Sequence, residues 1–112
     1  MIVKEINGVE RGFRFGTYTF KIISEISDLK TIESLFAALK DEPLKFLSVF
    51  YFACAKHYAI SKKQEVDFNE SDVCDWLDEI GFQESQIMLT ELLNSYTLKN
   101  MKAPMTGQAA QQ

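Results

Sequence analysis

The sequence contains few of the cysteines that form disulfide bonds or structural metal sites. Its 112 residues include two cysteines, Cys54 and Cys74, and neither belongs to a CxxC pair or to a zinc-ligand spacing. Both lie in apolar stretches, which predicts two small buried thiols in a reducing cytoplasm. We therefore expect neither a disulfide framework nor a structural metal ion.

Long apolar runs and an excess of basic residues are also lacking. The most apolar run, residues 46–55, has ten residues, whereas a membrane-spanning helix needs roughly 20. The chain starts Met-Ile-Val-Lys-Glu-Ile and carries charge at once, so we expect no signal peptide and no membrane partner. Lys and Arg number 12 against 16 Asp and Glu, which gives a net charge of −4. This balance disfavours nucleic acid as a partner, because clustered cations are needed to neutralise phosphates.

Signatures of catalysis are absent as well. The one histidine, His57, has no GxSxG, HExxH or phosphate-cradling glycine motif near it or near any candidate nucleophile. It lies at the edge of an apolar helical face, where a partly buried structural histidine is the commoner role. We therefore predict no catalytic residue and no cofactor, and we expect that the protein is not an enzyme.

A group of carboxylates follows helical spacing in the second half of the chain. They lack the glycine-containing loop of a calcium site, so no metal is expected there. A solvated acidic face is the simpler interpretation, and a docking surface for a basic partner is the alternative. The four residues are Asp72, Asp75, Asp78 and Glu79.

The chain does contain enough apolar residues for one core. Hydrophobic residues make up 46% and charged residues 25%, which is typical of a globular domain and not of a disordered chain. We predict a mainly α, α+β fold in which a short N-terminal β-hairpin precedes a compact bundle of four to five helices. One domain is expected over residues 1–100, and residues 101–112 are expected to form a disordered tail.

Three of the five glycines fall within the first sixteen residues, which predicts a turn-rich start. Residues 2–6 and 13–15 are predicted strands on either side of Asn7-Gly8. Directly opposed like charges cost stability, so we predict a six-residue loop over residues 7–12 in place of a tight turn. The tight turn would oppose two like-charged pairs, Lys4 with Arg11 and Glu5 with Glu10. Residues 17–26 fit a strand or a helix equally well.

From residue 28 the apolar spacing is helical. Asp28 is a candidate N-cap for the first of these helices. Pro43 suits the first turn of the next, which is predicted to run to about residue 60. Asn69 can cap a third helix that Gly81 ends. A last helix is predicted over residues 84–99.

The helix predicted over residues 44–60 is apolar around nearly its whole circumference. A core face is already supplied by five of its residues, Leu44, Leu47, Tyr51, Cys54 and Tyr58. A central position in the fold explains the remaining apolar residues, whereas a partner on the outside explains them equally well. The last helix also carries apolar residues opposite its core stripe, and two such patches favour self-association or a hydrophobic client. The predicted partner-binding residues are Val49, Phe52, Ile87 and Leu98.

The opening Ile6-Asn7-Gly8, followed by Phe13-Arg14-Phe15-Gly16 and then by helices, resembles the tail assembly chaperones of long-tailed bacteriophages. An aromatic and alanine-rich helix at residues 51–55 (Tyr-Phe-Ala-Cys-Ala) comes before an acidic helix around Asp75-Trp76-Leu77-Asp78 and extends the resemblance over residues 1–80. The resemblance implies a non-enzymatic role in virion assembly. Such proteins bind the tape-measure protein in the cytoplasm of the bacterial host, help the tail-tube protein polymerise around it, and are absent from the mature virion. The resemblance also favours a helix over residues 17–26.

Two other functions are compatible with parts of this sequence. A small acidic helical interaction module unrelated to tails, such as a phage regulator that binds a host protein, has the same apolar patches and is the alternative. A helix-turn-helix DNA-binding domain is disfavoured, because its would-be recognition helix, residues 84–98, contains no Lys or Arg.

Overall fold

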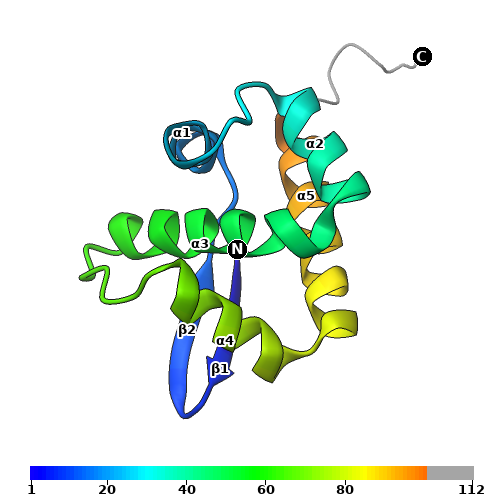
Figure 1. The fold of residues 1–112 in the computed structure, drawn as a ribbon. Helices are drawn as coiled ribbons and strands as arrows, with labels where there is room; N and C mark the ends of the chain where they lie inside the picture. The colour runs from blue at the N-terminus through cyan, green and yellow to red at the C-terminus, as the bar shows by residue number, and fades with distance from the viewer. Residues whose placement is uncertain (101–112) are drawn as a thin grey trace.

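The computed structural model describes residues 1–100, with the side chains of residues 1–96. A hairpin of β1 (Ile2–Ile6) and β2 (Val9–Phe13) is followed by five helices, as Figure 1 shows: α1 (Thr17–Ile26), α2 (Ile32–Asp41), α3 (Pro43–Ser61), α4 (Glu70–Ile80) and α5 (Phe82–Asn100). This confirms the predicted α+β fold with an N-terminal hairpin and a helical bundle. The tail predicted over residues 101–112 lies outside the described residues.

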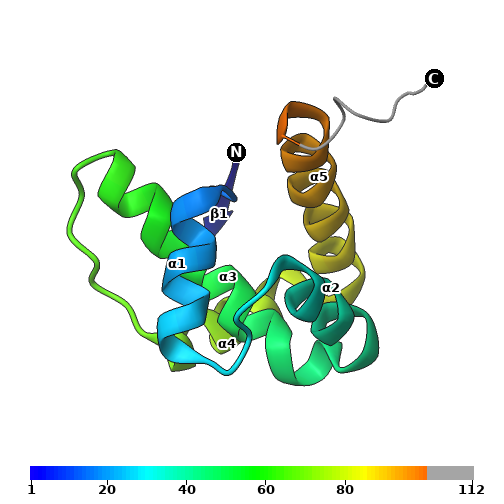
Figure 2. The same cartoon turned by 90° about the horizontal axis from the view of Figure 1, so that it is seen from above.

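α3 crosses the middle of the molecule. α1 and α2 lie on one side of it, and the hairpin and α4 lie on the other (Figure 1). Seen from above, α1 lies over α3, and α2 stands beside α5 (Figure 2). Nine residues of α3 are buried, and they occupy roughly two-thirds of the helix circumference. A central position therefore accounts for most of the apolar circumference of α3, one of the two explanations that the sequence left open.

The hairpin turns at Asn7-Gly8, so the predicted six-residue loop is wrong, and β2 ends at Phe13 instead of continuing to Phe15. Both turn residues have positive φ, 53° and 81°, the combination of a type I′ turn whose twist matches that of the strands. The register opposes the two like-charged pairs that the prediction avoided, Lys4 with Arg11 and Glu5 with Glu10.

Distant segments supply opposite charges to one of these pairs, Lys4 and Arg11. The Lys4 ammonium donates to the Glu84 carboxylate at 2.6 Å. The Arg11 guanidinium lies 3.2 Å from the Asp67 carboxylate and 4.5 Å from the centre of the Trp76 indole ring. Since each cation has its own partner, the repulsion between the two is offset.

Residues 17–26 form a helix, as the family resemblance favoured. The Thr19 hydroxyl accepts a hydrogen bond from the Gly16 backbone N–H at 3.1 Å and so satisfies one free donor at the start of α1. Thr19, Ile22 and Ile23 are buried against the core.

The predicted cap of α2 is wrong: α2 starts after Thr31, not after Asp28. Thr31 and Ser34 form a reciprocal capping box, with side chain-to-backbone hydrogen bonds of 3.0 and 3.1 Å. The residues between α1 and α2 instead close α1, because the Lys30 ammonium binds the carbonyl oxygens of Ser24 and Ser27.

The remaining helix limits follow the sequence closely. α3 begins at Pro43, as predicted. The Asn69 side chain accepts from the Asp72 N–H at 2.9 Å and caps α4, and Gly81, with φ of 94°, ends it. α5 begins at Phe82, two residues before the predicted start, because the chain re-enters a helix directly after Gly81. Within the described part of the chain, no helix is both long and apolar enough to cross a lipid bilayer.

Candidate docking surface

An apolar groove of about 390 Å³ opens where the first turns of α3 and α5 meet the second half of α4. Its floor contains Leu47, which is buried, and Leu77, which is half-buried. Two lining residues face the solvent: the side chain of Leu44 is 88% exposed and that of Phe82 is 57% exposed. Large apolar side chains this exposed at the mouth of an apolar groove are typical of a surface that a partner covers.

Leu44 and Phe82 each owe their position to the start of a helix. Pro43 occupies the first turn of α3, where its missing N–H costs nothing, and Leu44 follows it. Gly81 adopts a positive φ between α4 and α5, so Phe82 starts the next helix at the same end of the molecule. The Ser48 hydroxyl donates to the Glu70 carboxylate at 2.9 Å and ties α3 to α4 beside the groove.

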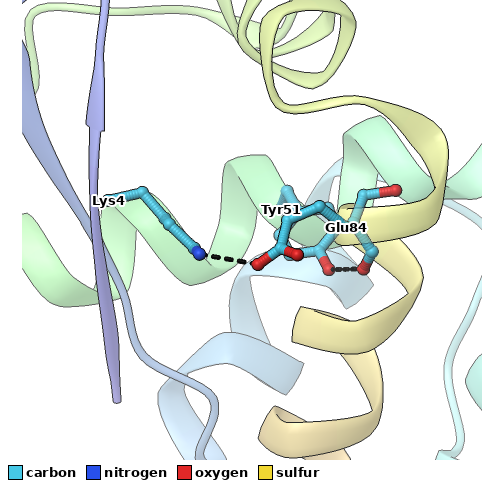
Figure 3. A network of polar contacts seen from close by, with 4 residues as sticks. Lys4, Tyr51 and Glu84 are labelled. Atoms are coloured by element: carbon cyan, nitrogen blue, oxygen red, sulfur yellow. Dashed lines mark hydrogen bonds and ion pairs between the residues drawn. The ribbon is translucent and has the colours of Figure 1, made fainter.

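A polar network fixes the α5 wall of the groove (Figure 3). The Tyr51 hydroxyl donates to the Ser85 carbonyl oxygen at 2.5 Å, while Glu84 next to it accepts from Lys4 of β1. Burial raises the pKa of Tyr51 far above its ordinary value, so the hydroxyl keeps its proton and remains a donor. The first turn of α5 is thereby held by both α3 and the hairpin.

The one charged residue among the described residues that line the groove is acidic. Asp78 is among the residues that line it, and none of the described lining residues is Lys, Arg or His. Asp75 and Glu79 are exposed on the same helix, as both the solvated acidic face and a docking surface for a basic partner require. Asp72 differs: it is half-buried, and its carboxylate accepts from the Asn69 N–H at 2.9 Å.

None of the three sequence-predicted binding residues whose side chains are described lines this groove. Val49 and Phe52 are half-buried and pack against the core, and the Phe52 ring lies 5.9 Å from that of Phe68. Ile87 is 50% exposed on α5 but does not line the groove. The side chain of Leu98 lies outside the described residues. A role of these four residues in binding stays a prediction.

The sequence analysis missed both exposed residues of the groove. Helical periodicity predicts Leu44 on the core face of α3, which is wrong, and the predicted helix start at residue 84 leaves Phe82 outside the last helix. Helical periodicity gives the side of the helix on which a residue lies, but not where the neighbouring helices end. The local signal is that each residue directly follows a helix-starting Pro43 or a helix-ending Gly81 and so lies in the first turn of its helix.

The one histidine joins two helices and does not open onto the groove. His57 is buried, and its Nδ1 lies 2.8 Å from the Thr19 hydroxyl of α1. Burial, and to a smaller extent the charge of Arg14, lowers the pKa of His57 below its ordinary value. Thr19 is fully buried, so the pair positions α1 against α3 and does not present a nucleophile to a substrate.

The two thiols lie in different surroundings. Cys54 is buried in α3, as predicted, and burial raises its pKa. Cys74 is exposed and lines the groove, so the expectation that both thiols are buried is wrong. The α4 position of Cys74 faces solvent because Val73 and Trp76 supply the buried face of that helix. In the described part of the chain, no cluster of three or more His, Cys, Asp or Glu side chains is arranged to hold a metal ion.

Comparisons with models of protein families, with curated proteins and with solved structures found no match to this chain.

Proposed function

We propose that this protein is a non-enzymatic tail assembly chaperone of a long-tailed bacteriophage and that it binds the tape-measure protein through the α3–α4–α5 groove. The observation that carries the proposal is the pair of exposed side chains, Leu44 and Phe82, at the mouth of an apolar groove. A long helical client with an apolar stripe would bury that stripe against them. The net charge of −4 would help to keep such a complex in solution.

The resemblance of residues 1–80 to tail assembly chaperones supports the choice of client. Two of the three helices that form the groove, α3 and α4, belong to this part of the chain. The proposal places the protein in the cytoplasm of the host during assembly and outside the mature virion. The tail-tube protein is the second proposed partner, since the tube polymerises around the client.

Co-expression with the tape-measure protein of the same genome tests this function. We expect a soluble tape-measure protein that co-purifies with the chaperone. A tape-measure protein that stays insoluble while the chaperone is soluble and unbound would contradict the proposal.

Matched variants test the surface. Leu44→Gln should reduce co-purification strongly, because a polar amide replaces an apolar contact at the interface. Ile60→Gln is the control, since Ile60 is also exposed (41%) but lies at the other end of α3. Both variants must show the thermal unfolding of the parent chain. Ile87→Gln tests the predicted patch on α5: loss of the client in this variant alone would place the binding surface there and not in the groove.

A further inference from the structure

We propose that the groove selects a basic amphipathic helix, one whose apolar stripe is flanked by Lys and Arg. This inference rests on the proposed function, because it names the chemistry of the client segment that the groove would bind. It follows from the apolar lining and from the charges around it.

The apolar part of the groove suits a helix. Leu44 and Phe82 come from two different helices, and Leu47 and Leu77 supply apolar surface between them. Apolar residues at positions i, i+3, i+4 and i+7 of a client helix form a continuous stripe that can contact all four. Polar residues beside that stripe would then face the rim of the groove.

The rim is acidic on two sides. Asp78 lines the groove from α4, and Asp41 and Glu42 are exposed just before Pro43; Asp75 and Glu79 add exposed negative charge elsewhere on α4. The two ion pairs found among the described side chains join Lys4 to Glu84 and Arg11 to Asp67, so they leave these five carboxylates without a cationic partner.

The nearest basic residue in the sequence points elsewhere. Lys45 follows Leu44, but its ammonium lies 5.2 Å from the centre of the Phe46 ring, and it lines a separate hollow with Val49 and Glu70. The groove therefore combines an apolar lining with nearby carboxylates that form no ion pair with any described side chain. A basic client helix would be attracted by the carboxylates and would bury its apolar stripe against the lining. A second copy of this chain has a net charge of −4, so its charge would be repelled by the same carboxylates.

Two designed peptides separate apolar from electrostatic recognition. Each has about 18 residues, five helical turns, with the same leucine stripe. One carries Lys on its polar face and the other carries Glu. Titrated into the full chain and followed by fluorescence anisotropy, the Lys peptide should bind about tenfold more tightly, and added salt should reduce the difference.

Cys74 reports where the peptide binds. It is exposed in the groove, whereas Cys54 is buried, so a maleimide reagent labels Cys74 selectively. The Lys peptide should slow this labelling. Leu44→Gln should weaken binding about tenfold, while the Ile60→Gln control should leave it unchanged. Asp78→Lys should shift the preference toward the Glu peptide by about threefold.

Three outcomes would overturn the inference: equal affinity for both peptides, binding that leaves Cys74 labelling unchanged, or a concentration-dependent dimer that protects Cys74 without any peptide. The peptides contain no tape-measure sequence, so the two proposals fail separately. Selective Lys-peptide binding beside an insoluble tape-measure protein contradicts the function alone. A co-purifying tape-measure protein beside equal peptide affinities contradicts this inference alone.

Discussion

The buried Thr19 hydroxyl joins three groups, and its geometry assigns the proton on His57. Thr19 Oγ1 donates to the Arg14 carbonyl oxygen at 2.9 Å and accepts from the Gly16 N–H. A hydroxyl has one proton, so His57 Nδ1, at 2.8 Å, is the donor in the third contact. Neutral His57 therefore carries its hydrogen on Nδ1, and further protonation would place a charge on a buried ring beside Arg14.

This arrangement predicts that the protein loses stability as the ring becomes protonated. The pKa of His57 is lowered in the folded state, whereas it is about 6.5 in the unfolded chain. The unfolded state therefore binds the proton more readily, so the stabilising effect is present above pH of about 6.5 and is lost as the pH falls through the folded-state pKa. Urea unfolding should give a lower free energy of unfolding at about pH 5.5 than at about pH 7.5.

His57→Gln is the control for this prediction, because His57 is the only histidine. Glutamine can still donate to Thr19 but does not titrate. The variant should be less sensitive to pH in this window, with the remaining dependence due to carboxylates at lower pH. An unchanged pH dependence would show that another group is responsible.

At the scale of elements, the hairpin meets α3 at a position where only glycine fits. A Cβ atom built on Gly12 would lie 2.3 Å from ring atoms of Tyr58. Gly12→Ala should therefore destabilise the fold by about 1–3 kcal/mol, since the ring must move or β2 must shift. Chemical denaturation measures this change directly.

A double-mutant cycle identifies the cause. Tyr58→Ala removes the ring, so adding Gly12→Ala to that background should cost much less than it does in the parent chain. Equal costs in the two backgrounds would mean that the alanine acts on the hairpin itself and not on its contact with α3.

The limits of α4 can be predicted from the sequence, whereas the register of the hairpin cannot. Asn69 and Gly81 signal the limits of α4 through atoms within one helical turn, so both predictions are confirmed. In the hairpin, Lys4 faces Arg11 but has an acidic partner in Glu84, which is 80 residues from Lys4 along the chain. A rule for opposed charges that considers the two strands alone cannot include such a partner, and it therefore predicted the wrong loop.

At the scale of the whole molecule, the groove exists because three helix ends meet. The apolar spacing of α3 placed Leu44 and Leu47 on one face, and the structure buries Leu47 but leaves Leu44 outside. Leu44 lies in the first turn of α3 at the mouth of the groove, whereas Leu47 lies one turn further along the helix on its floor. The exposure of a residue such as Leu44 depends on how the helices are arranged in space. The groove therefore cannot be predicted from the apolar spacing of one helix.

The central position of α3 predicts that Cys54 reports on global unfolding. Its thiol is buried and its pKa is raised, so reaction with a thiol reagent requires α3 to separate from the elements on both sides. In native buffer only Cys74 should react quickly with Ellman's reagent, and both thiols should react in denaturant. In a Cys74→Ser variant, the Cys54 rate should rise with urea in proportion to the unfolded fraction measured by circular dichroism. Rapid reaction of Cys54 in native buffer would instead mean that α3 opens locally and does not hold the two sides of the molecule together.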